Sequence, residues 1–150
     1  MNTFKKQILA TCKKVIDEKL NDLFSALKDI TDSANNESKS SAGDKHETGR
    51  AMMQIEQEKL GKQIQEWETQ KSILDKIDLS KPSNLISLGS LVETNKGLFF
   101  MAANVGKIKV EDKEVMVISL LSPLGACLMK HQEGDEFEFN KNAYKIMQIC

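Results

Sequence analysis

The sequence predicts an α+β chain, in which an N-terminal antiparallel coiled-coil hairpin of two helices precedes a small antiparallel β domain with one short helix. The first half repeats apolar residues at spacings of three and four, and the second half alternates short apolar runs with turn residues. Between them, Lys81-Pro82-Ser83 has the composition of a hinge. We therefore expect a coiled coil over residues 1–77, a linker over 78–84 and a β domain over 85–150.

The first helix is expected from Phe4 to Ile30, where apolar residues form the seam of an amphipathic or coiled-coil helix. The stretch from Thr31 to Ala42 is rich in Ser, Asn and Asp, which compete for backbone hydrogen bonds and favour turns. The chain is therefore expected to reverse direction there. The seam consists of Leu9, Cys12, Ile16, Leu20, Leu23, Leu27 and Ile30.

A second helix is expected from about Lys45 to Ile77, with an apolar stripe that can pair antiparallel with the first. Arms of about 30 residues, at 1.5 Å per residue, make a hairpin roughly 45 Å long. The same seam could pair within one chain or between chains, and we expect a monomer. The stripe consists of Met53, Leu60, Ile64, Trp67, Leu74 and Ile77.

The second half reads as short strands separated by polar turns. One helix is expected from Ser122 to Lys130, because Ser122 is a suitable N-cap and Pro123 suits the first helical position, where its missing N–H loses nothing. The expected strands are Ile86 to Val92, Leu98 to Ala103, Val105 to Val110, Glu114 to Ser119, Phe137 to Phe139 and Tyr144 to Ile149.

Charge excludes one broad class of function. The formal net charge is −1, with 13 basic and 13 acidic residues up to Ile77 and 8 basic and 9 acidic residues after it. Because neither half is a polycation, bulk electrostatic binding to nucleic acid is not expected.

Cysteine spacing and hydropathy indicate the compartment. Cys12, Cys127 and Cys150 have neither the spacing of a zinc site nor that of a disulfide framework. No apolar run approaches the roughly 20 residues that cross a bilayer. We therefore expect a cytoplasmic protein with no membrane contact.

The most informative segment is Gly43-Asp44-Lys45-His46-Glu47, between the two expected helices. Asp44 and Glu47 are three residues apart, so at a helix start both carboxylates can lie on one face, about 5–6 Å apart. Such a pair can supply oxygen ligands to Mg²⁺ and support phosphodiester hydrolysis, with the remaining ligands coming from a partner. The same spacing also has the form of a capping box, with Asp44 as the N-cap. The segment alone does not decide between these interpretations.

Two further signatures follow in the second half: Ser122-Pro123-Leu124-Gly125 and then Gly134-Asp135. Taken in this order after the acidic segment, they resemble the Gre transcript-cleavage factors of bacterial RNA polymerase. The similarity covers nearly the whole chain and is most specific from Val117 to Glu136.

The resemblance implies an accessory factor and not a self-sufficient enzyme. It implies that residues 85–150 have an FKBP-like fold that docks on the rim of RNA polymerase, with Ser122, Pro123, Leu124 and Gly125 as docking candidates. The coiled coil would enter the secondary channel. There Asp44 and Glu47 would help to hold Mg²⁺, shared with the polymerase active site, and water, so that the polymerase cleaves the 3′ end of backtracked nascent RNA.

Several positions depart from the family pattern, and two other functions stay open. Where the family usually has Asn, an acidic residue and Tyr after the acidic pair, this chain has Thr48, Arg50 and Ala51. Where the family usually has a polar residue before Ser122, this chain has Leu121. The first group of changes motivates a Gre-fold channel regulator without cleavage activity. The capping interpretation motivates a coiled-coil protein-interaction module.

Overall fold

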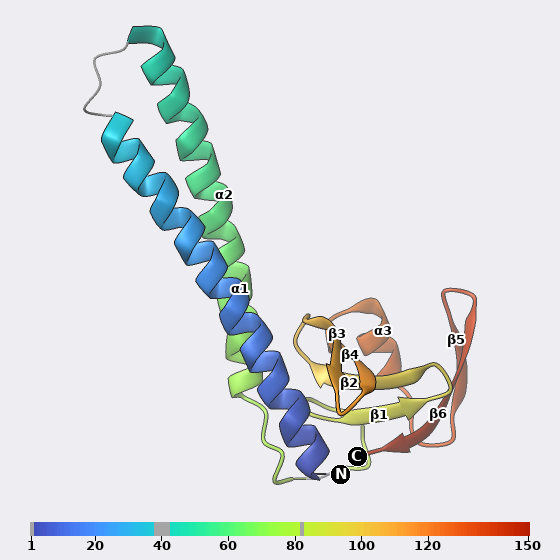
Figure 1. Ribbon diagram of the computed structural model, residues 1–150. Coiled ribbons are helices and arrows are strands. Elements are labelled where there is room, and N and C mark those ends of the chain that lie inside the picture. Colours follow the sequence, from blue (N-terminus) through green and yellow to red (C-terminus); the bar gives the residue numbers. More distant parts are fainter. Residues whose placement is uncertain (1, 38–42, 82) are drawn as a thin grey trace. The chain divides into compact units, whose positions relative to one another are not determined.

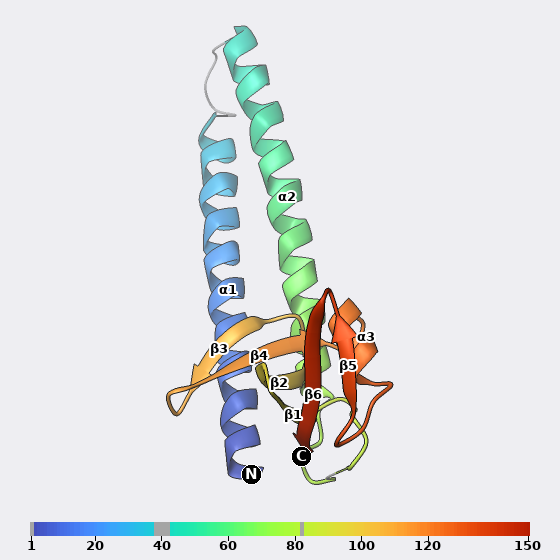
Figure 2. The same ribbon diagram turned by 90° about the vertical axis from the view of Figure 1, so that its right-hand side faces the viewer.

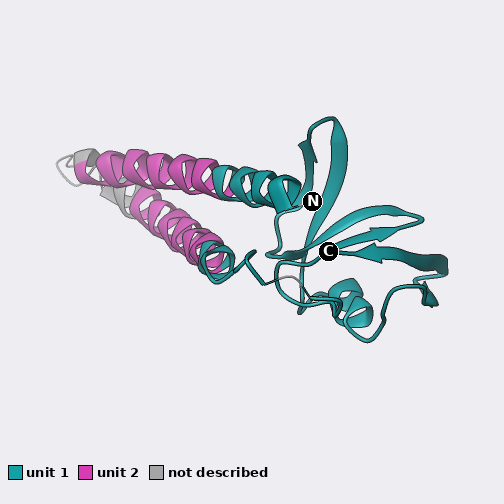
Figure 3. Cartoon of the chain, turned by 90° about the horizontal axis from the view of Figure 1, so that it is seen from below, with its two compact units in different colours: residues 1–15, 70–150 teal, residues 16–69 magenta. Residues whose placement is uncertain are grey.

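A computed structural model of the chain describes residues 2–37, 43–81 and 83–150, and for residues 36, 37 and 43–47 it describes the backbone alone. The chain divides into two compact units, which Figure 3 colours separately. One unit comprises residues 16–69, and the other comprises residues 1–15 and 70–150. Each unit is a set of residues that pack mainly against one another, so the units are not the same as the expected domains 1–77 and 85–150. The boundary between those domains stays a prediction.

The unit of residues 16–69 is a helical hairpin. It is formed by parts of α1 (Asn2–Glu37) and α2 (Gly43–Asp75), which run antiparallel and side by side (Figures 1 and 2). Ile16 and Leu20 of α1 and Leu60 and Ile64 of α2 are buried. The expected coiled-coil seam is therefore present in this unit.

Helix α1 is longer than the sequence predicted. The first helix is expected to end at Ile30, but α1 extends to Glu37, into the stretch of residues 31–42 within which the turn is expected. The Nε2 atom of Gln57 donates a 3.3 Å hydrogen bond to the Oγ1 atom of Thr31, and Ala34 is half-buried. This segment is therefore helical and contacts α2, although its composition favours turns. Residues 38–42 of the expected turn lie outside the described residues.

The other unit contains a six-stranded sheet in the order β3-β4-β2-β1-β6-β5, and Figures 1 and 2 label its strands. A short helix, α3 (Pro123–Leu128), follows β4. This arrangement confirms the predicted α+β fold class, a helical region followed by a mostly antiparallel sheet with one short helix. The strands are β1 (Leu91–Thr94), β2 (Gly97–Ala102), β3 (Gly106–Val110), β4 (Lys113–Ser119), β5 (Glu136–Phe139) and β6 (Asn142–Ile149).

One pair of strands is parallel, although the sequence predicted an antiparallel domain. Strands β2 and β4 pair in parallel from Leu98 opposite Val115 to Ala102 opposite Ser119. The reason is the position of β3, which pairs antiparallel with the outer edge of β4 and does not lie between β2 and β4. The chain thus reverses twice before β4 joins β2, so the two strands run in the same direction.

The two faces of the sheet bury different sets of side chains. On one face, Leu128 of α3 belongs to a buried cluster with Val92, Phe99 and Met101. Leu91 and Phe100 are opposite each other in the β1–β2 ladder, and both are fully buried. Near them, Phe4 of α1 helps to line a cavity of about 300 Å³. The first turns of α1 therefore belong to the same compact unit as the sheet.

The expected strand from Ile86 to Val92 is mostly wrong, because β1 begins only at Leu91. Gly89 has a φ of +92°, which interrupts extended structure, and the Oγ atom of Ser90 accepts a 2.9 Å hydrogen bond from the N–H of Ser87. Ile86 still belongs to the buried cluster. The side chain of Ile86 is therefore buried although the residue lies in a loop and not in a strand. The other expected strands and the helix agree with the structure to within two residues at each end.

Candidate functional site

The acidic pair belongs to the first residues of α2. That helix begins at Gly43, so Asp44 and Glu47 lie within its N-terminal part, directly after the reversal of the hairpin. Backbone N–H groups at a helix start carry partial positive charge, which favours nearby carboxylates. The side chains of Asp44 and Glu47 lie outside the described part of the structure, so their proposed metal and capping roles stay predictions.

The next turn of α2 carries the residues at which the sequence differs from the Gre pattern that it resembles. Thr48, Arg50 and Ala51 are all exposed. Arg50 also helps to line a hollow of about 350 Å³ within the helical unit, together with Ala34, Asn35, Met53, Gln54 and Gln57. A guanidinium group therefore lies one turn beyond the acidic pair.

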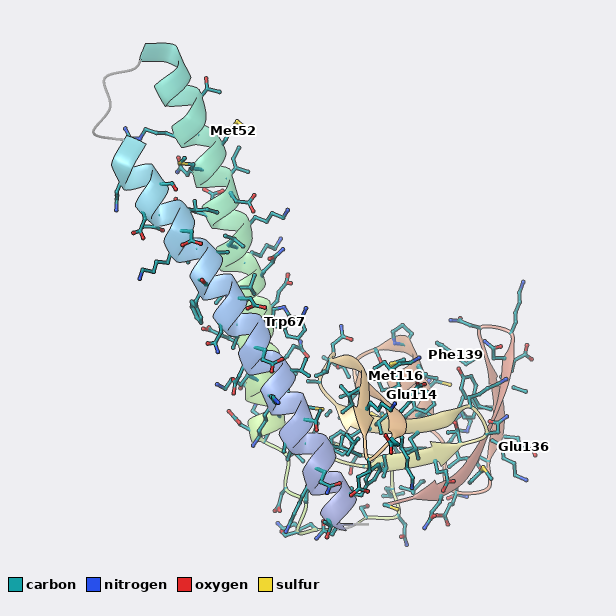
Figure 4. All side chains as sticks on the ribbon, viewed as in Figure 1. Met52, Trp67, Glu114, Met116, Glu136 and Phe139 are labelled. Carbon is teal, nitrogen blue, oxygen red and sulfur yellow. The ribbon has the colours of Figure 1, made fainter. Side chains whose placement is uncertain are left out.

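Two apolar residues of α2 are exposed near the same end of the helix, and neither belongs to the expected apolar stripe. Met52 is 67% exposed and Ile55 is 65% exposed. Figure 4 shows the side chain of Met52 projecting from α2. Their spacing of three residues, outside the apolar seam, is the signal that could have identified them.

Within the described residues, no cluster of three or more His, Cys, Asp or Glu side chains is arranged to hold a metal ion. Two carboxylates supply only part of a Mg²⁺ coordination sphere, which this ion usually completes with water and with oxygen atoms of a substrate. The shared Mg²⁺ site that the resemblance implies for Asp44 and Glu47 therefore stays a prediction.

Ser122 caps α3, as the sequence predicted. Its Oγ atom accepts a 3.0 Å hydrogen bond from the N–H of Gly125, and the same hydroxyl donates a 2.6 Å hydrogen bond to the carbonyl of Ser119. Pro123 occupies the start of the helix and is exposed. The Ser-Pro turn is thus held by its own hydrogen bonds, with Pro123 facing solvent.

The other two docking candidates lie toward the interior. Leu124 is half-buried and packs against the hydrophobic cluster, and Gly125 is buried. A Cβ atom at Gly125 would lie 2.0 Å from the carbonyl oxygen of Ser119, so only glycine fits there. These positions therefore shape the turn, and the surface of the turn is formed by other residues.

The most exposed large apolar side chain of the described residues is adjacent to this turn. Leu121 is 91% exposed, and Met129, just after α3, is also exposed. The candidate set of Ser122, Pro123, Leu124 and Gly125 omitted both. The signal for Leu121 was present in the sequence, as an apolar residue where the related pattern has a polar one.

The Gly134-Asp135 signature has a structural role in the loop before β5. Gly134 has a φ of +89°, and a carboxylate oxygen of Asp135 accepts a 2.9 Å hydrogen bond from the N–H of Gln132. The same oxygen lies 3.3 Å from Nδ1 of His131, whose ring stacks on Phe137 at a centroid distance of 4.4 Å. The signature therefore fixes the connection between α3 and β5.

No helix in the described residues is long and apolar enough to cross a membrane.

Two solved structures are similar to this chain over most of its length. One is a structure of the transcription factor Gfh1, with 20% identity and a TM-score of 0.36, covering 91% of this chain and 92% of that chain. The other is a crystal structure of the GreA factor homolog 1 (Gfh1) protein of Thermus thermophilus, with 19% identity and a TM-score of 0.36, covering 92% of this chain and 94% of that chain. No protein-family model and no curated protein matches this chain.

Proposed function

We propose that this chain is an RNA polymerase-binding transcription elongation factor of the Gre type. In this proposal it enters the secondary channel of the bacterial enzyme and stimulates Mg²⁺-dependent cleavage of backtracked nascent RNA. The observation that carries the proposal is the place of the acidic pair, at the start of α2 directly after the reversal of a helical hairpin. The Ser-Pro turn at the start of α3 supports it independently.

The proposed mechanism assigns distinct tasks to the described elements. The hairpin presents Asp44 and Glu47, and the backbone N–H groups at the start of α2 favour their ionised forms. Their carboxylates would orient a water molecule and add oxygen ligands to those that the polymerase supplies. When bound, Mg²⁺ supplies Lewis acidity and lowers the pKa of the attacking water. The polymerase would perform the cleavage, so the chain itself is not an enzyme.

The sheet unit would provide the attachment to the polymerase. The turn of Ser122 and Pro123 is held by hydrogen bonds to Ser119 and Gly125, so little conformational freedom is lost when a partner contacts it. In this proposal the partners are bacterial RNA polymerase and the 3′ end of its nascent RNA, and the factor acts as a cytoplasmic monomer.

A second function within the same class is favoured by one group of residues. Thr48, Arg50 and Ala51 are exposed directly after the acidic pair and carry neither a carboxylate nor an aromatic ring. If a carboxylate and an aromatic ring at these positions are needed to orient Asp44 and Glu47, this chain would occupy the channel and regulate transcription without stimulating cleavage.

The test uses a stalled, backtracked bacterial elongation complex with 5′-labelled RNA and Mg²⁺. The wild type is compared with Asp44→Asn/Glu47→Gln, because the amides keep the size of both side chains and most of their capping capacity while they remove the charge. The matched control is Glu56→Gln/Glu58→Gln, which removes two exposed carboxylates from the middle of the same helix.

The proposal expects shortened RNA that can be extended again with the wild type and with the control, but not with the double amide variant. Binding to polymerase, measured separately, should be the same for all three proteins. Binding without any shortening by the wild type would favour the non-cleaving regulator. An absence of binding would contradict both functions and favour the coiled-coil interaction module.

A further inference from the structure

An exposed apolar surface surrounds the Ser-Pro turn. We define the α3 surface as Leu121, Pro123, Ala126 and Met129, all of which are exposed, whereas Gly125 and Leu128 between them are buried. Leu121 is 91% exposed, so nearly its whole side chain is in contact with water. Single exposed apolar residues are common, whereas a contiguous exposed apolar patch marks an interaction site.

The backbone that carries Leu121 is fixed. The N–H of Leu121 donates a 3.1 Å hydrogen bond to the Oγ atom of Ser119. The N–H of Ser122 donates a 3.1 Å hydrogen bond to the carbonyl of the same serine. A fixed backbone reduces the entropy that is lost on binding. The position of Leu121 is therefore already set before a partner contacts it.

Charge indicates the class of partner. From Val115 to Gln132 the sequence contains no Asp or Glu, and Lys130 is its only Lys or Arg. Binding to a nucleic-acid backbone normally requires several cations, so one lysine does not suit RNA or DNA. An apolar surface with one cation at its border suits a protein partner that presents an apolar pocket with a carboxylate beside it.

We propose that Leu121 is the anchor residue of the docking surface, and that it inserts into an apolar pocket on RNA polymerase with Met129 and Lys130 at the border. This inference rests on the proposed function, and it assigns the binding energy to an apolar contact where the related pattern has a polar residue. The contact should therefore be less sensitive to salt than one based on charge.

The test measures the affinity of the chain for bacterial RNA polymerase by titration at 50 and 300 mM salt. Leu121→Ala should weaken binding by roughly 10- to 50-fold, since it removes most of the side chain that would be buried. The matched control is Leu85→Ala, because Leu85 is 69% exposed and lies outside the α3 surface. Both substitutions are at exposed positions and should leave the circular dichroism spectrum unchanged.

The outcomes separate this inference from the proposed function. If the wild type binds polymerase and Leu121→Ala binds equally well, the anchor assignment is wrong and the proposed function stands. If the wild type does not bind at all, both fail. If the wild type instead sediments with vesicles of phosphatidylcholine and phosphatidylglycerol, and Leu121→Ala does not, the surface binds lipid and the protein-partner inference is overturned.

Discussion

The side-chain nitrogen of Lys5 donates a 3.1 Å hydrogen bond to the backbone carbonyl oxygen of Cys150, 145 residues further along the chain. Lys5 is buried, and desolvation lowers its pKa, an effect that Cys150 partly opposes. In the same unit, the Oε1 atom of Gln70 accepts a 2.7 Å hydrogen bond from the N–H of Asn104. Within this unit, hydrogen bonds thus join the start of α1 to the end of β6 and the end of α2 to the loop after β2.

Replacing Lys5 by Ala should therefore loosen the start of α1. We expect the free energy of unfolding to fall by about 1 kcal/mol, because the carbonyl of Cys150 loses its charged donor while the burial of a cation is relieved. Lys6 is exposed, and Lys6→Ala should change the stability by less than about 0.5 kcal/mol. Urea unfolding measures both values, and hydrogen exchange of the α1 amides locates the change. Equal effects of the two substitutions would contradict the role of Lys5.

Gly125→Ala should destabilise the turn that begins α3. The new Cβ atom would lie 2.0 Å from the carbonyl oxygen of Ser119 and 2.8 Å from the Oγ atom of Ser122, so the backbone must shift. We expect a loss of about 1–3 kcal/mol, as is typical of overpacking.

Gly61→Ala is the matched control, because a Cβ atom there would have no neighbour within 4 Å and the site lies inside α2. It should stabilise the protein by up to about 1 kcal/mol. Urea unfolding of both variants, followed by circular dichroism, tests the pair. A stable Gly125→Ala protein with an intact α3 would contradict the tight turn.

Burial of Cys12 should make the stability depend on pH in the alkaline range. The side chain is fully buried, and desolvation raises the pKa of its thiol from an ordinary value of 9.0 to about 12. The contribution of Cys12 is complete below pH 9 and declines as the pH rises toward 12, because only the unfolded chain ionises the thiol easily.

The measurement is the difference in unfolding free energy between the wild type and Cys12→Ala at pH 8 and pH 10.5. The difference should become smaller at the higher pH, and the comparison removes the opposite contribution of Lys5, which both proteins share. A difference that is constant or grows with pH would contradict this account.

The half-buried Cys127 should react with a thiol reagent faster than the buried Cys12.

Local chemistry made several parts of the fold predictable from the sequence. Ser122 supplies an N-cap oxygen, and Pro123 lacks an N–H at a helical position where that N–H would have no partner in the helix. The two residues therefore predict a helix start, and α3 begins there. The apolar spacing of Ile16, Leu20 and Leu60 likewise predicted buried helical positions. These features depend on neighbours within one or two turns of the chain.

The features that could not be predicted depend on distant parts of the chain. Helix α1 continues past Thr31, where Gln57 of the other helix bonds to it. The parallel pairing of β2 and β4 follows from the outer position of β3, which periodicity does not encode. For the site, the resemblance supplied Asp44 and Glu47, while the exposure of Leu121 and the inward position of Leu124 required the folded structure.

The most direct test of the central claim is the Mg²⁺ dependence of RNA cleavage in a backtracked elongation complex. If Asp44 and Glu47 help to hold the ion, the wild type should reach half of its maximal cleavage rate at a lower Mg²⁺ concentration than Asp44→Asn/Glu47→Gln. At limiting Mg²⁺ the variant should be slower by about tenfold or more, since loss of even outer-shell partners of a metal typically costs 10- to 100-fold. The deficit should shrink as Mg²⁺ rises. Identical Mg²⁺ curves for the two proteins would contradict the claim that these carboxylates act on the metal.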